Sequence, residues 1–166
     1  ICSGNIGTPV LDTLNKKQDV SIVELSSFHL EHIKNLKSDI GVLLNVEQDH
    51  LDRHHSFETY KKVKEKVLFG CSVGLTVKEI LLSIDSIGEQ IFSFEDLTKP
   101  FKKEIYNLFK NKWPHHEILN IKAVLSVVLV FEALKNKKAS SEVMIEQPDL
   151  INKCAEALIT FKRLKH

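Results

Sequence analysis

The stretch DVSIVELSSFHLEHIKNLKSDIGVLLNV, residues 19–46, decides the fold class because two strand patterns flank a helix pattern. DVSIVEL (19–25) and DIGVLLNV (39–46) are mostly apolar and contain many β-branched residues, which is typical of strands covered on both faces. SSFHLEHIKNLK (26–37) carries its apolar residues at loosely helical spacing. Strand, helix and strand in this order predict an α/β fold with a mainly parallel sheet flanked by helices.

The rest of the chain extends this alternation. SGNIG (3–7) indicates a glycine turn, and Thr8-Pro9 after it is typical of the start of a short helix. Ser56 can cap an amphipathic helix that runs to Gly70. Within residues 71–112, LTVKEILLSI and EQIFSF fit either strands or short helices, and KPFKKEIYNLFKNK (99–112) is a basic amphipathic segment. Two further helices are predicted, from Trp113-Pro114 to about Leu134 and over 149–161.

Composition excludes several classes of protein. Of the 166 residues, 43% are apolar and 27% are charged, which is ordinary for a globular domain and not for a disordered chain. The net charge of +1 gives no pull toward nucleic acid or acidic membranes, and no apolar run approaches the roughly 20 residues of a membrane span. Three widely spaced cysteines and the absence of a leader favour a cytoplasmic protein with reduced thiols.

Polar residues follow both predicted strands where each one ends. Glu24 lies at the end of the first, and Asp49, His50 and Asp52 follow the second. Ligands of open α/β sheets bind at such strand ends, and a carboxylate beside an imidazole suits Mg²⁺ or Mn²⁺ better than a closed zinc site. The alternative is that Glu24 only adjoins an exposed strand end and that His50 belongs to a solvated loop. We expect the neighbouring His54 and His55 to be solvated.

Two other features bear on phosphate binding. The backbone N–H groups of SGNIG at a helix start could bind an anion, but no glycine is followed by lysine, so a Walker A motif is absent from these residues. Lys64 stands among three other lysines on an amphipathic helix, where a solvated basic face is the simplest interpretation.

Taken together, several segments resemble the Mur ligases in order and approximate spacing. The string ELSSF-x-LE resembles the corresponding motif of one branch of that family, whose members join D-glutamate to UDP-N-acetylmuramoyl-L-alanine. The terminal segment also resembles the family's F-x-x-L-x-H-R motif. The segments are GNIGTP (4–9), VELSSFHLE (23–31), NVEQDHLDRH (45–54), SFETYKKVK (56–64), HHEILNIKA (115–123) and ALITFKRLKH (157–166).

The resemblance implies an ATP-dependent ligase of peptidoglycan precursor synthesis. ATP would phosphorylate the alanine carboxylate of UDP-N-acetylmuramoyl-L-alanine to an acyl phosphate, which the amine of D-glutamate then attacks. Two Mg²⁺ ions would neutralise the phosphates and carboxylate that must approach each other.

The resemblance also implies roles for single residues. Glu24 matches a Mg²⁺ ligand beside the ATP phosphates. His50 matches a ligand of the second metal site that lies close to the substrate carboxylate. Lys64 matches a lysine that is carbamylated and thereby made anionic. Lys64 and His50 are therefore the implied catalytic residues, and Glu24, His50 and Lys64 the implied metal ligands.

Other matches concern the substrates. Asn5 and Ser26, together with His50, match positions that contact the muramoyl substrate. Asn120 matches an asparagine near the adenine, and His116 and Glu117 adjoin it. Glu117 departs from the usual asparagine, which puts its nucleotide contact in doubt, and His29 replaces a common glutamine.

The expected organisation is a partial Mur ligase central ATPase domain over 1–166, without its Walker A segment and without the flanking N- and C-terminal domains. Such a chain should be inactive by itself and monomeric, and should bind neither nucleic acid nor membrane. The alternatives are a non-catalytic remnant or interaction module with the same fold, and a sister Mur ligase that adds another amino acid. An unrelated metal-dependent hydrolase would not explain GNIG or ELSSF.

Overall fold

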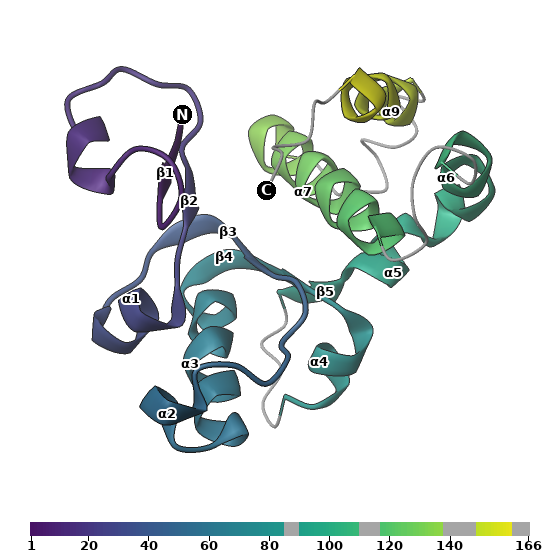
Figure 1. The fold of residues 1–166 in the computed structure, drawn as a ribbon. Coiled ribbons are helices and arrows are strands. Elements are labelled where there is room, and N and C mark those ends of the chain that lie inside the picture. The colour runs from purple at the N-terminus through teal and green to yellow at the C-terminus, as the bar shows by residue number, and fades with distance from the viewer. Residues whose placement is uncertain (85–89, 110–116, 138–148, 161–166) are drawn as a thin grey trace. The chain divides into compact units, whose positions relative to one another are not determined.

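The computed structural model describes residues 1–84, 90–109, 117–137 and 149–160 (Figure 1). Every strand pair in these ranges is parallel, and helices separate and flank the strands. The α/β class predicted from the strand–helix–strand pattern is therefore confirmed. The strands form two sheets, one of two strands and one of three.

The chain divides into two compact units. The first unit contains Ile1–Leu36 and Val46–Val67, and the second contains Lys37–Asn45 with the described residues from Leu68 onward. Each unit holds one of the two sheets. We describe the units one after the other.

In the first unit, β1 (Cys2–Gly4) pairs with β2 (Ile22–Glu24). Gly4 has a φ of 114° and lies opposite Glu24, so close that a Cβ atom on Gly4 would collide with the Glu24 carbonyl oxygen. Only glycine adopts this backbone conformation without cost. The chain then forms the 3₁₀ helix η1 (Val10–Thr13), where a short helix was predicted.

The prediction that strand 19–25 is covered on both faces is wrong for its central residues. Ile22 and Val23 are 61% and 40% exposed, and β1 is the only described strand that pairs with β2. An apolar β-branched sequence favours the extended backbone, but burial also requires neighbouring elements on both faces.

Three helices complete the first unit: α1 (Ser27–His32), α2 (Leu51–His54) and α3 (Phe57–Phe69). Helix α1 is shorter than predicted, and α2 is a helical turn inside the segment expected to be a polar loop. Helix α3 starts as predicted, because the Ser56 hydroxyl accepts the backbone N–H of Thr59 at 3.1 Å.

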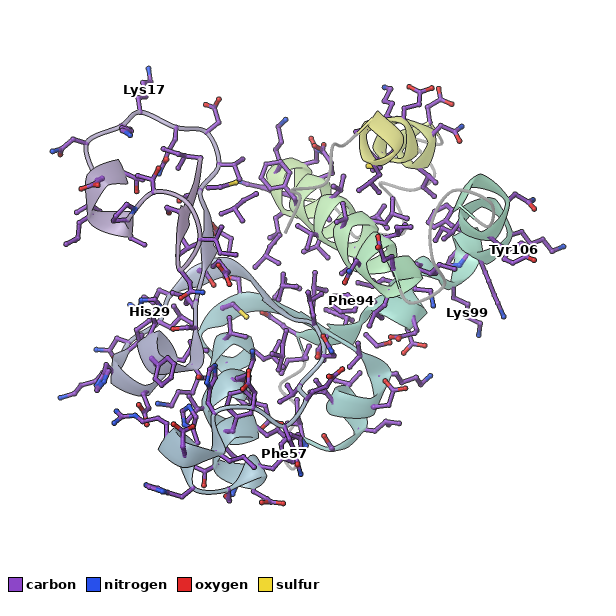
Figure 2. All side chains as sticks on the ribbon, in the orientation of Figure 1. Lys17, His29, Phe57, Phe94, Lys99 and Tyr106 are labelled. Atoms are coloured by element: carbon purple, nitrogen blue, oxygen red, sulfur yellow. The ribbon has the colours of Figure 1, made fainter. Side chains whose placement is uncertain are left out.

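In the second unit, β3 (Ser38–Leu43), β4 (Cys71–Thr76) and β5 (Ile91–Ser93) pair in this order. The short helices α4 (Lys78–Leu82) and α5 (Phe94–Thr98) follow β4 and β5. The ambiguous segment 71–112 thus contains both strands and helices. Leu75 and Phe94 are 0% exposed, and Phe94 is labelled in Figure 2.

The remaining elements of the second unit are helical. They are η2 (Lys99–Phe101), α6 (Lys102–Phe109), α7 (Ile118–Asn136) and α9 (Leu150–Thr160). Helix α7 contacts β3, β4, α5 and α9 (Figure 1), and a core cluster of Ile105, Ile121 and Leu125 joins α6 to α7. The two long helices predicted here are confirmed over their described parts. Within those parts of the chain, no helix has both the length and the apolar character needed to cross a bilayer.

Candidate functional site

Glu24 and Asn5 meet at the carboxyl end of the two-stranded sheet. Glu24 is the last residue of β2, and Asn5 follows β1. The backbone N–H of Asn5 donates to the Glu24 carbonyl at 2.9 Å, and Asn5 Nδ2 donates to Glu24 Oε1 at 3.4 Å. The Glu24 side chain is exposed, so a carboxylate with an accessible oxygen is held at a strand end. This donor chemistry fits an oxygen-preferring cation such as Mg²⁺.

The backbone amides next to this corner are largely satisfied within the protein. Gly4 N donates to the Thr8 carbonyl at 3.0 Å, and the Asn5 amide is bound by Glu24. Two of the N–H groups that were considered for anion binding therefore already donate hydrogen bonds within the protein.

Ser26 caps α1 together with His29 (labelled in Figure 2). The Ser26 hydroxyl accepts the backbone N–H of His29 at 3.3 Å and lies 2.8 Å from His29 Nδ1. The backbone N–H of Ser26 donates to the same Nδ1 at 3.2 Å, which requires Nδ1 to be unprotonated. The departure from glutamine at His29 thus preserves a capping box.

His50 stands immediately before α2 in a left-handed conformation, with a φ of 50°. Its backbone N–H donates to Asp49 Oδ1 at 2.8 Å, and its Nε2 lies 3.5 Å from Asp49 Oδ2. The side chain is 44% exposed. A left-handed non-glycine residue costs backbone strain, and such residues are concentrated at functional sites. The geometry presents a reachable imidazole beside a carboxylate.

Aromatic rings surround one side of His50. The ring centroid of His50 lies 5.0 Å from that of Phe28 on α1 and 6.2 Å from that of Tyr60 on α3. The His54 ring lies 5.9 Å from Phe28 and 5.2 Å from Tyr60. We call Phe28, His50, His54 and Tyr60 the ring cluster.

Lys64 contacts the same cluster. Its Nζ lies 5.5 Å from the centroid of the Tyr60 ring, one helical turn earlier on α3. A cation near an aromatic face is favourable. His50 and Lys64, which are distant in sequence, are therefore both neighbours of Tyr60.

The expectation that His54 is solvated is wrong, whereas His55 is exposed as predicted. The His54 side chain is 0% exposed, and its Nε2 lies 3.0 Å from the Ser27 hydroxyl. Its Nδ1 is buried without a hydrogen-bond partner and lies 3.8 Å from Glu31 Oε1. A helical turn at α2 explains this position, because it directs one of two adjacent histidines inward and leaves the other at the surface.

An ion pair and a lysine hold α1 against its neighbours. Arg53 donates to Glu31 Oε2 from Nε at 3.2 Å and from Nη2 at 2.9 Å. The Arg53 hydrogen bond holds the pKa of Glu31 below its usual value, and the weaker penalty of desolvation opposes it. Lys66 Nζ donates to the carbonyls of Leu30 at 3.0 Å and Glu31 at 3.4 Å, near the end of α1. Arg53 thus joins α2 to α1.

The candidate residues fall in both units. Asn5, Glu24, Ser26, His50 and Lys64 all belong to the first unit. Within the described ranges, no three side chains of His, Cys, Asp or Glu gather as a metal site, so Glu24 and His50 do not share one cage with a third such donor.

The residues considered for nucleotide binding belong to the second unit. Glu117 immediately precedes α7, and Asn120 is exposed in the first turn of that helix. His116 lies outside the described residues.

Sequence reasoning missed four contributors to the site: Ser27, Phe28, His54 and Tyr60. Tyr60 could have been found, since it precedes Lys64 by four positions and so shares its helix face. Phe28 was noted only as an apolar helix residue. No local signal joins Ser27 to His54, because their contact spans 27 residues of sequence.

Comparison with known proteins finds a family match in the N-terminal part of the chain. Residues 5–80 match the Mur ligase middle domain. This range contains Asn5, Glu24, Ser26, His50 and Lys64, whereas Asn120 and its neighbours lie outside it. Residues 5–80 are therefore similar to the middle domain of the Mur ligases.

Similar relatives include three proteins that are each named "UDP-N-acetylmuramoylalanine--D-glutamate ligase". The one from Buchnera aphidicola subsp. Schizaphis graminum is 57% identical over 65 residues, which are 39% of this chain and 15% of the relative. That from Citrifermentans bemidjiense is 47% identical over 66 residues, again 39% and 15%. That from Legionella pneumophila strain Lens is 40% identical over 84 residues, or 49% and 19%. The chain thus spans less than a fifth of the length of these relatives.

Proposed function

We propose that the chain is part of an ATP-dependent ligase that joins D-glutamate to UDP-N-acetylmuramoyl-L-alanine. The observation that carries the proposal is that one Mur ligase segment holds Glu24, His50 and Lys64, with His50 and Lys64 next to the same tyrosine. The names of the relatives supply the substrates.

The proposed reaction has two steps. The γ-phosphoryl group of ATP passes to the alanine carboxylate, which gives an acyl phosphate and ADP. The D-glutamate amine then attacks the acyl carbon, an amide bond forms, the bond to phosphate breaks, and a proton leaves the nitrogen. Both steps bring anions together, so their rate depends on fixed positive charge.

Glu24 and His50 are the residues that would hold Mg²⁺, each at one of two sites. Bound Mg²⁺ would neutralise the phosphate and carboxylate oxygens that react. Lys64 would contribute after carbamylation, in which its neutral amine adds to CO₂ and releases a proton, leaving an anionic carbamate. The half-buried position of Lys64 against Tyr60 would limit where that carbamate can point.

The substrate contacts follow the same division. Asn5 and Ser26 are proposed to meet the muramoyl substrate beside Glu24. Their side chains are already oriented by Glu24 and His29, which lowers the entropic cost of binding. Asn120, Glu117 and His116 are proposed to lie near the nucleotide. We propose a cytoplasmic, monomeric enzyme, and expect catalysis to need more of the polypeptide than these 166 residues, since none of their glycines is followed by lysine.

The test is a ligase assay on the complete gene product that contains these residues. Phosphate release should require both UDP-N-acetylmuramoyl-L-alanine and an amino acid, with D-glutamate preferred over the other amino acids tested. Lys64→Ala should abolish it, and short-chain carboxylic acids should restore part of the rate. Lys62→Ala, on an exposed position of the same helix, is the matched control and should retain the rate.

Two results would contradict the proposal. Equal rates with another amino acid would favour a sister Mur ligase, and folded protein without substrate-dependent phosphate release would favour a non-catalytic relative. Full activity of Lys64→Ala would remove the proposed role of the carbamate.

A further inference from the structure

We propose that His54 is a positioning residue that holds Phe28 and Tyr60 against the ring of His50 and is itself fixed by the Ser27 hydroxyl. The structural role of His54 stands on the contacts alone. Its importance for catalysis rests on the proposed function, because only that function assigns a role to the His50 ring, as a ligand of Mg²⁺.

His54 is more completely buried than His50 and His55, the two other histidines of its segment. Its side chain is 0% exposed, against 44% for the side chain of His50. One ring nitrogen, Nε2, contacts Ser27 Oγ at 3.0 Å. The other, Nδ1, makes no hydrogen bond but lies 3.8 Å from Glu31 Oε1. A buried ring nitrogen without polar neighbours is unfavourable, so an apolar ring of the same size would fill this space without that cost. An apolar ring could not make the contacts with Ser27 and Glu31.

The His54 ring touches the two rings that flank His50. It stacks on Phe28 at 5.9 Å with an interplanar angle of 28°, and meets Tyr60 at 5.2 Å with an angle of 52°. Phe28 and Tyr60 in turn lie 5.0 Å and 6.2 Å from His50. Rings at these separations attract each other in defined orientations. If His54 were displaced, Phe28 and Tyr60 would both lose a contact that holds them next to the His50 ring.

The backbone transmits the same constraint. His54 N donates to the His50 carbonyl at 3.0 Å across the single turn of α2. One residue earlier, Arg53 binds Glu31 through two nitrogens. The segments VELSSFHLE and NVEQDHLDRH are thus joined at two points, by Ser27 with His54 and by Glu31 with Arg53 and His54. Contacts at two points restrict the rotation of α2 against α1, which a contact at one point would leave free.

Two substitutions separate the hydrogen bond from the packing. His54→Phe keeps an aromatic ring in the buried site and removes both the bond to Ser27 and the contact with Glu31. Ser27→Ala removes the same bond from the other side and leaves the histidine in place. His55→Asn is the matched control, because His55 is adjacent and exposed, and asparagine tolerates its φ of 65°.

The readout is the ring resonances of His50 in the NMR spectrum of the isotope-labelled 166-residue chain, recorded at one fixed pH. Ring currents of Phe28 and Tyr60 act on the His50 Cε1–H, so its chemical shift reports their position. We expect both His54→Phe and Ser27→Ala to move this resonance by more than its linewidth, and His55→Asn to leave it in place. An unmoved resonance in both folded variants overturns the proposal, and Ser27→Ala decides alone if His54→Phe does not fold.

A second measurement concerns catalysis in the complete gene product. A displacement of His50 should lower kcat roughly 10-fold to 100-fold while KM for ATP stays the same. Loss of thermal stability with an unchanged kcat would overturn the catalytic part of the inference. If the unsubstituted protein shows no ligase activity, the proposed function fails, but the His50 resonance still tests the positioning role independently.

Discussion

The two units of this protein are built by different means. The second unit has a three-stranded sheet with fully buried side chains such as Leu75 and Phe94, and α7 packs on β3 and β4. The first unit has a two-stranded sheet whose Ile22 is 61% exposed. Its helices are held by side-chain hydrogen bonds, ring contacts and an ion pair.

This difference separates stability from chemistry. Apolar burial contributes most of the free energy of folding, and it is concentrated in the second unit. Polar contacts contribute less per bond but are directional, so they can fix the orientation of a histidine or a carboxylate. The candidate metal and substrate residues lie in the unit where polar contacts dominate. Substitutions in the two units should therefore have different consequences.

The largest expected effect is in the core of the second unit. Phe94→Ala should lower the free energy of unfolding by about 3–5 kcal/mol, because it removes a fully buried ring and leaves a cavity. The measurement is urea denaturation, combined with hydrogen exchange of the β4 and β5 amides. Phe92→Ala is the matched control. Phe92, in the middle of β5, is 42% exposed, so about 1 kcal/mol or less is expected.

Hydrogen exchange also tests the division into units. If Phe94→Ala accelerates exchange in β1 and β2 as much as in β4 and β5, the two units unfold together. The units would then have no separate stabilities to compare.

An intermediate effect is expected at the glycine turn of the first unit. Gly4→Ala should destabilise β1 and β2 by at least about 2 kcal/mol, because the new Cβ meets the Glu24 carbonyl at a φ that favours glycine. Gly7→Ala is the control. Gly7 also has a positive φ, of 85°. A Cβ added to Gly7 would lie 3.7 Å from its nearest neighbour, the Cys2 carbonyl oxygen, so a loss of about 1 kcal/mol is expected. Amide exchange of Ile22–Glu24 measures both, and equal effects would show that the close approach to Glu24 is unimportant.

The smallest effect is the response to acid, which each unit should show through one carboxylate. Arg53 lowers the pKa of Glu31 in the first unit, and the Ser93 hydroxyl, with Lys78, lowers the pKa of Asp96 in the second. A lowered folded pKa means that the stabilisation is complete above the usual value and is lost as pH falls through the folded value. The first unit should thus begin to weaken below about pH 4.5 and the second below about pH 3.8.

Hydrogen exchange at a series of acidic pH values, corrected for the intrinsic rate, resolves the two units. Glu31→Gln should flatten the response of the first unit only, and Asp96→Asn that of the second only. A response that is unchanged by both substitutions would assign the acid sensitivity to other groups.

Much of the fold followed from local sequence. The strands at 22–24 and 38–43, the helix after Ser56 and the two long C-terminal helices all carry periodic apolar patterns. Strand β1 overlaps the segment 3–7 that was predicted as a glycine turn, and the segment of β5 fitted either a strand or a short helix. Helix α2 was missed because four mostly polar residues between two left-handed histidines resemble a loop.

The site was predicted unevenly. Glu24 lies at its expected strand end, whereas the metal roles of Glu24, His50 and Lys64 stay predictions. His54 was misjudged, since burial of a polar side chain depends on partners that are distant in sequence. The nearest of these, Ser27 and Phe28, belong to another motif.

The sequence by itself determined the α/β class, the Mur ligase segment and the residue types available for chemistry. Backbone propensity, periodicity and motif order are local or linear properties, so they can be read without coordinates. Only the tertiary structure decided that His54 is buried, that Ser27 binds it, and that His50 and Lys64 both lie next to Tyr60. These are contacts between α1, α2 and α3, and their free energy exists only when the helices have packed. The polar segment NVEQDHLDRHH thus supplies one exposed histidine before α2 and one buried histidine that holds its surroundings in place.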